Sequence, residues 1–240
     1  GNAVDYTINC AVGLPAMTGP ADRADEPVNH VLPAWDLLTG STAAVSMIAA
    51  LYARSETGEG QEIRVPLSDV AAATLSTLGQ VAEVLVAGQD RPRLGNDLYG
   101  ALGRDFVTAD GDRIMLVGLT LRQWQGLIDA LDIHQAISQL EDELGISLKE
   151  EGARFVHRDK LNALIQARVS VISRAELVAK FDANGVCWGP YRTLHEATVT
   201  DPLFSSANPV FSDIEHVSGY TYPTSGFPAS FPTLTREMPV

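Results

Sequence analysis

The stretch HVLPAWDLLTG (residues 30–40) places a carboxylate, Asp36, directly after Trp35 at the predicted start of a long apolar helix. Two kinds of chemistry fit this position. An N-cap aspartate accepts hydrogen bonds from the unpaired backbone N–H groups of a first helical turn. Alternatively, the same carboxylate is a nucleophile that the positive end of the helix keeps ionised. Residue types and spacing alone leave both interpretations open.

Other common catalytic motifs are missing from the sequence. It contains no GxGxxG, GxxxxGK, HExxH or GxSxG pattern, so nucleotide-binding, zinc-protease and serine-hydrolase interpretations lose their main support. The five histidines have no metal-ligand spacing, and only His30, six residues before Asp36, is a site candidate. Cys10 and Cys187 stand far apart, which fits a reducing compartment and argues against a zinc ribbon. We therefore expect no metal site.

Composition and charge exclude several classes of protein. The chain has 240 residues, of which 45% are hydrophobic and 20% charged, as in ordinary globular proteins. Its net charge is −13, opposite to the charge expected of proteins that bind nucleic acid or anionic membranes. No apolar run of about 18 residues is free of polar interruption. We expect no nucleic-acid or membrane partner and a cytoplasmic location, and the start at Gly1 suggests a fragment.

Hydrophobic periodicity and turn residues predict helices and strands over most of the chain. The predicted helices cover residues 6–12, 37–54, 68–87, 121–131, 133–144, 150–169, 173–184 and 193–198. The predicted strands cover residues 62–67, 104–108, 113–119 and 186–192. The ADGD segment (residues 109–112) predicts a hairpin between two of them. Ser173 and Glu176 have capping-box spacing, and Gly185 follows the end of that helix.

The long predicted helix 37–54 is apolar on nearly every face, so we expect it to be buried on most sides. Gly58 supplies the turn that ends it. Ser68 is the expected cap of the next helix, and Gly88 is its stop. From Asn208 onward the proline-rich sequence predicts an extended tail across the surface.

Three stretches, HVLPAWDLLTG, TGEGQEIRVPLSDVA and NGVCWGPYRTLHEATVTDP, together resemble the family III CoA transferases, the carnitine and bile-acid CoA transferase family. The resemblance spans essentially the whole chain. It implies that Asp36 is the catalytic aspartate and Asp69 the second, helix-opening aspartate, which we interpret as an N-cap. It also implies segments before and after these residues that the chain lacks, and an interlocked homodimer.

The fold that the resemblance implies is α/β, with part of a Rossmann-like large domain and a smaller α+β domain. We expect residues 1–90 and 205–240 to belong to the large domain and residues 91–204 to form the small one. The implied substrate is an acyl-CoA, with no cofactor beyond the CoA that it carries. The expected intermediates are a mixed anhydride and an aspartyl-CoA thioester. The first-turn N–H groups, with glycine N–H groups of residues 95–100, would hold the oxyanion.

Within this family the chain most resembles members that move CoA between the two carboxyl groups of one unsaturated C5 diacid. Three alternatives stay open: an intermolecular CoA transferase, an alpha-methylacyl-CoA racemase and a non-catalytic fragment. The resembling racemases carry a histidine where this chain has Val4, which argues against racemisation.

Further site candidates follow from the expected acyl-CoA substrate. Arginine matches a carboxylate with two parallel hydrogen bonds, amide and phenol groups can donate to a diacid, and an indole can shield an anhydride from water. The competing interpretations are a solvated basic loop, ordinary turn residues and plain core. The substrate-binding candidates are Tyr6, His30, Trp35, Arg91, Arg93, Asn96, Tyr99 and Arg104.

Overall fold

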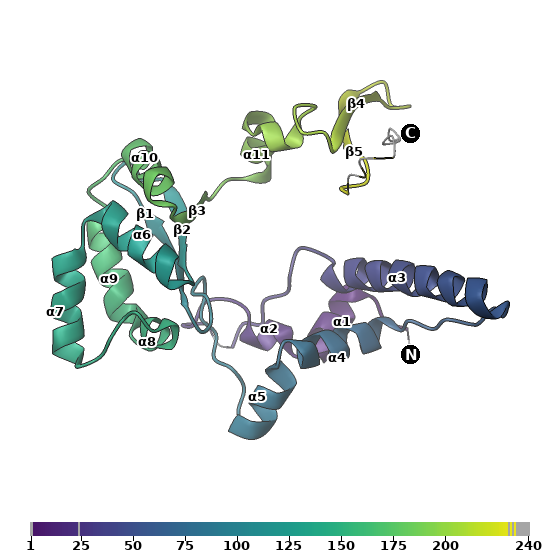
Figure 1. Cartoon of the computed structure of the whole chain (residues 1–240), viewed down its shortest axis with the longest axis horizontal. Helices are drawn as coiled ribbons and strands as arrows, with labels where there is room; N and C mark the ends of the chain where they lie inside the picture. The colour runs from purple at the N-terminus through teal and green to yellow at the C-terminus, as the bar shows by residue number, and fades with distance from the viewer. Residues whose placement is uncertain (1, 24, 230, 232, 234–240) are drawn as a thin grey trace.

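The computed structural model of the chain describes residues 2–23, 25–229, 231 and 233. Figure 1 shows three regions, which we name the helical part (residues 5–87), the small domain (residues 102–190) and the C-terminal arm (residues 194–225). A segment without helix or strand, residues 88–101, joins the helical part to the small domain. The predicted domain boundaries after residues 90 and 204 stay predictions.

The small domain is built on an antiparallel sheet in the order β1-β2-β3. Its strands are β1 (Leu102–Val107), β2 (Arg113–Gly118) and β3 (Cys187–Pro190). The predicted hairpin is confirmed, with Val107 opposite Arg113 and Gly111 at a φ of 84° in the turn. A positive φ is easy for glycine, so the sequence signal and the turn agree.

Helices pack on this sheet and enclose the main hydrophobic core. They are α6 (Leu121–Leu131), α7 (His134–Leu144), α8 (Glu151–Val156), α9 (Arg158–Val169) and α10 (Arg174–Asn184). The core includes Phe106, Leu116, Trp124, Leu131, Ile165 and Phe181. The start of α10 is as predicted, because the Ser173 hydroxyl accepts the N–H of Glu176 at 3.3 Å.

The prediction of a single helix over residues 150–169 is wrong, because the chain breaks at His157 between α8 and α9. No glycine or proline marks this break. Its cause is tertiary: the buried guanidinium of Arg154 in α8 donates to four backbone carbonyls, those of Gly118, Leu119, Leu148 and Lys149. These bonds fix α8 across the end of β2, while α9 packs along β1.

The helical part has a much smaller core, formed by Ile8, Trp35, Ala71 and Leu75. Its helices are α1 (Asp5–Ala11), α2 (Leu14–Met17), α3 (Ala34–Thr57), α4 (Leu67–Thr77) and α5 (Gln80–Ala87). Glycines in the left-handed conformation end α3 at Gly58 and α5 at Gly88, as predicted.

Several predictions for the helical part are wrong. The single helix expected over residues 68–87 is divided at Gly79, whose φ of 77° bends α4 and α5 by 67°. The N-cap residue of α4 is Pro66, so the predictions that Ser68 or Asp69 caps this helix are wrong. Residues 62–67, predicted as a strand, form none. A strand needs a neighbouring strand for its backbone hydrogen bonds, and none lies beside this segment among the described residues.

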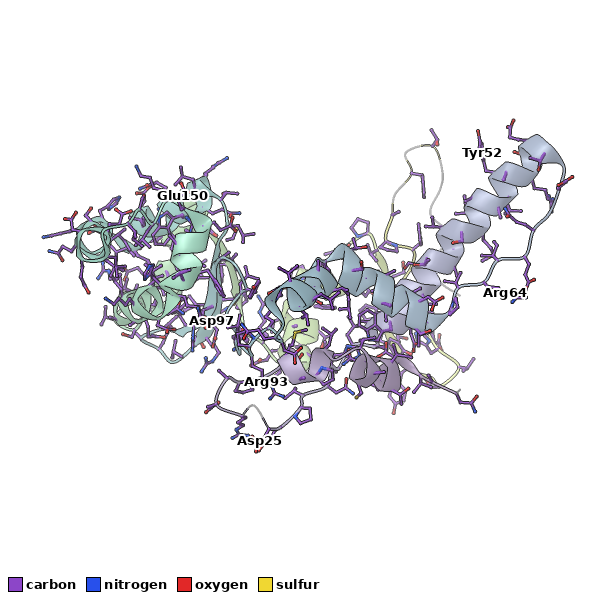
Figure 2. All side chains as sticks on the ribbon, turned by 90° about the horizontal axis from the view of Figure 1, so that it is seen from below. Asp25, Tyr52, Arg64, Arg93, Asp97 and Glu150 are labelled. Atoms are coloured by element: carbon purple, nitrogen blue, oxygen red, sulfur yellow. The ribbon has the colours of Figure 1, made fainter. Side chains whose placement is uncertain are left out.

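The expectation that helix α3 is buried is also wrong for the described residues. Val45, Ile48 and Tyr52 are 68%, 68% and 70% exposed, and Figure 2 shows Tyr52 on the part of α3 that extends away from the rest of the chain. By length and composition α3 could cross a membrane, and so could α4 and α5 as one bent span, although core helices of soluble proteins pass the same test. The absence of a membrane partner therefore stays a prediction.

The C-terminal arm contains more structure than the predicted extended tail. It begins with α11 (Leu194–Thr200), capped by Thr193, and a 3-10 turn (Pro202–Phe204). The strands β4 (Phe211–Glu215) and β5 (Thr221–Ser225) then form an antiparallel hairpin. Gly219, at a φ of 81°, makes the turn. Residues 230, 232 and 234–240 of the predicted tail lie outside the described residues.

The close contact between α6 and α10 predicts that one added methyl group at Gly126 lowers the stability of the protein. A Cβ added at Gly126 would lie 2.3 Å from the backbone oxygen of Asn184, and a backbone atom cannot move aside cheaply. Gly126→Ala should lower the free energy of unfolding by about 1–3 kcal/mol in urea titrations.

Gly152→Ala is the matched control, since nothing lies within 4 Å of its added Cβ. The control should leave stability unchanged or raise it by up to about 1 kcal/mol. Equal stabilities of the two variants would contradict the packing described for α6 and α10.

Candidate active site

The position of Asp36 differs from the N-cap that one interpretation predicted. Pro33 is the N-cap residue of α3, and Asp36 lies three residues further on, in the first turn. The carboxylate of Asp36 is exposed and has no hydrogen-bond or ion-pair partner among the described residues. The capping interpretation is therefore wrong, and the side chain is free for other chemistry.

A different carboxylate caps this helix. Asp5, in α1, accepts the backbone N–H groups of Trp35 at 2.7 Å and of Asp36 at 3.1 Å through the same oxygen. Its other oxygen lies 2.5 Å from Nε2 of His30. Asp5 is only 1% exposed. The sequence analysis missed this residue, because its partners follow about 30 positions later and no local pattern connects them.

The hydrogen bonds of Asp5 keep it ionised. Burial by itself would raise its pKa, but bonds from His30 and from the N–H groups of Asp36 and Trp35 outweigh burial and hold the pKa below its ordinary value. A charged carboxylate thus lies at the positive end of α3, where the helix dipole stabilises it.

The N–H groups of the first turn of α3 are all occupied. Asp5 takes those of Trp35 and Asp36, while those of Ala34 and Leu37 donate to backbone carbonyls at 2.7 and 3.2 Å. The expectation that these groups hold an oxyanion is therefore wrong. An oxyanion formed near Asp36 needs donors from elsewhere.

Tyr6, His30 and Trp35 are brought together beside Asp36. The Tyr6 and His30 rings meet edge to face with centroids 5.7 Å apart, and those of His30 and Trp35 are 6.5 Å apart. The Tyr6 hydroxyl donates to the carbonyl of Val31 at 3.3 Å. Trp35 is 3% exposed and belongs to the smaller core, as the plain-core interpretation expected. Of the three rings, those of Tyr6 and His30 are the more accessible.

Arg91 and Tyr99 form a separate group with Glu83 of α5. The guanidinium of Arg91 pairs with the Glu83 carboxylate and stacks 3.5 Å from the centroid of the Tyr99 ring. The Tyr99 hydroxyl donates to Glu83 at 2.5 Å. Hydrogen bonds from Arg91 and Tyr99 hold the pKa of Glu83 below its ordinary value. This group ties residues 88–101 to α5.

Arg93, Asn96 and Arg104 line a cleft of about 740 Å³ between residues 18–22 and the small domain. Figure 2 labels Arg93 where the helical part and the small domain meet. The Arg93 guanidinium is buried and donates to the carbonyls of Pro15, Ala16, Arg23 and Glu26, so it holds the loop after α2 in place.

Three further polar residues of this cleft donate to carboxylates. Two of them are arginines whose ion pairs leave part of each side chain exposed. Asn96 donates to Asp105 at 3.0 Å, and Arg104 donates to Asp97 at 3.0 Å while 43% of its side chain is exposed. Arg113 pairs with Asp105 and has 52% of its side chain exposed. Sequence reasoning missed Arg113, although its position at the start of β2, across the predicted hairpin from β1, was a signal.

No cluster of three or more His, Cys, Asp or Glu side chains suited to a metal ion occurs in the part of the chain that the structure describes. Both cysteines are free thiols and exposed.

Comparisons with known proteins identify the family to which this chain is similar. The model for CoA-transferase family III matches residues 1–239. The chain is 45% identical over 236 residues to 2-methylfumaryl-CoA isomerase of Chloroflexus aurantiacus, covering 98% of this chain and 58% of that protein. It is 30% identical over 193 residues to succinate–glutarate CoA-transferase of Agrobacterium fabrum, covering 80% of this chain and 46% of that protein.

The fold has solved counterparts. A crystal structure of a CaiB/BaiF family protein from Brucella suis matches with a TM-score of 0.71 and 24% identity, over 98% of this chain and 58% of that one. The chain thus spans 46–58% of the length of these proteins. The α/β fold class expected from the sequence is confirmed.

The buried carboxylate gives a stability prediction. Asp5→Ala should lower the free energy of unfolding at neutral pH by about 1–3 kcal/mol, because a helix cap is lost and two N–H groups lose their acceptor. The folded pKa of Asp5 lies below its unfolded value, so its contribution is complete above about pH 4. The contribution disappears as the pH falls through the folded pKa.

Urea titrations between pH 7 and pH 2.5 should show the wild type and the Asp5→Ala variant converging only below about pH 4. Asp69→Ala is the control, because Asp69 is exposed in the first turn of α4 and accepts no backbone N–H bond from another element. An equal loss in both variants would contradict the capping role of Asp5.

Proposed function

Because this chain belongs to CoA-transferase family III, we propose that it takes part in CoA transfer between carboxyl groups, with Asp36 as the nucleophile. One observation supports this choice of residue. The Asp36 carboxylate is exposed in the first turn of α3, while the N–H groups of that turn bond to Asp5 and to backbone carbonyls. Its lone pairs are therefore free to attack a thioester carbonyl.

The proposed reaction begins when a carboxylate oxygen of Asp36 attacks the thioester carbonyl of the acyl-CoA. The C–S bond breaks, the CoA thiolate leaves with the electron pair, and a mixed anhydride joins the acyl group to Asp36. The thiolate then attacks the side-chain carbonyl of Asp36. This step releases the acyl carboxylate and leaves an aspartyl-CoA thioester, without any proton, oxidant or cofactor.

We propose 2-methylfumaryl-CoA as the substrate and intramolecular transfer as the reaction. The free carboxylate at the other end of the released diacid attacks the aspartyl-CoA carbonyl, and the thiolate leaves again. The thiolate then attacks the acyl carbonyl of the new anhydride, which frees Asp36 and completes the isomerisation. The higher identity to an isomerase, 45% against 30% to an intermolecular transferase, supports this order of preference.

The diacid must stay bound while both of its ends are free. Arg104 and Arg113 are our candidates for holding it, because both side chains are about half exposed at the cleft and a guanidinium can bind a carboxylate through two parallel bonds. Arg91 pairs with Glu83 and Arg93 donates to four backbone carbonyls, so we propose both arginines as supports of the loop.

An intermolecular transferase is the second candidate, supported by the similarity to succinate–glutarate CoA-transferase. The chain spans 58% of the isomerase it resembles, so its activity by itself is also a proposal. A homodimer, a cytoplasmic location and the absence of a nucleic-acid partner stay predictions.

Asp36→Ala should lower the turnover of 2-methylfumaryl-CoA by about 1,000-fold or more. Chromatography of the two CoA isomers measures the turnover, and circular dichroism should show an intact fold. Asp69→Ala is a matched control, because Asp69 holds the same place in α4, three residues after a proline N-cap. The control should keep most of its activity. If Asp36→Ala retained a tenth of wild-type turnover, the nucleophile would be another group.

Free 2-methylfumarate labelled with ¹³C and added during turnover should stay out of the CoA ester pool, because the released diacid is re-esterified before it leaves. Mass spectrometry of the CoA esters measures this directly. Rapid labelling of 2-methylfumaryl-CoA would show an intermolecular transferase, with Asp36 keeping its role.

A further inference from the structure

Two carboxylates lie at the start of α3, and they have opposite environments. Asp5 is 1% exposed and accepts the N–H groups of Trp35 and Asp36, whereas Asp36 is exposed and without a partner among the described residues. We infer that Asp5 is a positioning residue, which occupies these N–H groups so that the Asp36 carboxylate stays extended and nucleophilic. This inference rests on the proposed function.

The alternative conformation of Asp36 follows from local chemistry. Aspartate side chains readily bond to backbone N–H groups near them. Pro33 at the N-cap has no N–H group, so the groups left free without Asp5 are those of Trp35 and Asp36. With Asp5 absent, the N–H groups at the start of α3 would attract the side chain of Asp36. Bonds to those groups would have to break before the carboxylate could attack, which raises the barrier of the first step.

The surrounding bonds hold Asp5 rigidly enough for this task. His30 lies at 2.5 Å from one carboxylate oxygen, and its backbone N–H donates to the side chain of Asn29 at 2.9 Å. Asn29 also accepts from Asn9 at 2.6 Å, and Asn9 in turn accepts the indole N–H of Trp35 at 3.2 Å. Asp5 and Asn9 are both buried, so this closed set of bonds connects α1, the loop before α3 and α3 itself.

The test compares Asp5→Ala with Asp5→Asn in the full-length protein. Asp5→Ala should lower kcat for 2-methylfumaryl-CoA at least tenfold with KM changed less than twofold, because binding is kept and the attack is slowed. Quenched single turnovers analysed by intact-mass spectrometry should show slower formation of the CoA adduct on Asp36. Asp5→Asn should regain most of the lost kcat, since its amide oxygen still accepts both N–H groups.

Each outcome has a defined meaning. A folded Asp5→Ala variant with kcat within twofold of wild type, or with only KM changed, overturns the inference. If Asp5→Ala does not fold, the activity of Asp5→Asn decides the question. An Asp5→Asn variant that retains most of its activity supports the positioning role. A loss above 100-fold overturns it, because the charge of Asp5 would then be what catalysis requires. Asp36→Ala, measured in parallel, tests the proposed function separately, because retained activity there refutes the nucleophile whatever the Asp5 variants do.

Discussion

The arrangement around Asp36 depends on the hydrogen bonds that the buried carboxylate of Asp5 accepts from the start of α3. A helix that begins without an N-cap side chain leaves N–H groups that need an acceptor. In α3 the N-cap residue is Pro33, whose side chain has no hydrogen-bond acceptor, so the acceptor comes from another helix. The bond therefore fixes α1 against α3 and keeps the Asp36 side chain outside the capping interaction.

The two parts of the chain differ in what stabilises them. The small domain has a core drawn from its sheet and from α6, α7, α9 and α10, whereas the hydrophobic core of the helical part has four buried residues and most of α3 is exposed. Hydrogen bonds and ion pairs therefore contribute a larger share of the stabilising contacts in the helical part than in the small domain. Arg93 is the clearest case, because its buried guanidinium donates to two carbonyls of α2 and to two of the loop that leads to His30 and Asp36.

Sequence reasoning succeeded where the signal was local. The ADGD turn, the Ser173 cap and the glycines that end helices each act within a few residues, and the structure has them where they were predicted. It failed where a partner lies far away in the chain. Residues 62–67 have strand composition but no neighbouring strand, and the Asp5 cap joins positions about 30 residues apart. The arginines near the cleft were recognisable by type, but their ion-pair partners were not.

Asp36 and Asp69 occupy the same helix position in different surroundings. Both follow a proline N-cap by three residues and both are exposed in a first turn. They differ in what happens to the N–H groups beside them. In α3 a buried carboxylate from α1 occupies those groups, whereas in α4 no side chain among the described residues accepts an N–H of the first turn. The carboxylate of Asp69 makes no cap hydrogen bond to its helix and accepts the Ser68 hydroxyl at 3.3 Å. The proposed role of Asp36 therefore rests on the N–H groups that Asp5 occupies in α3.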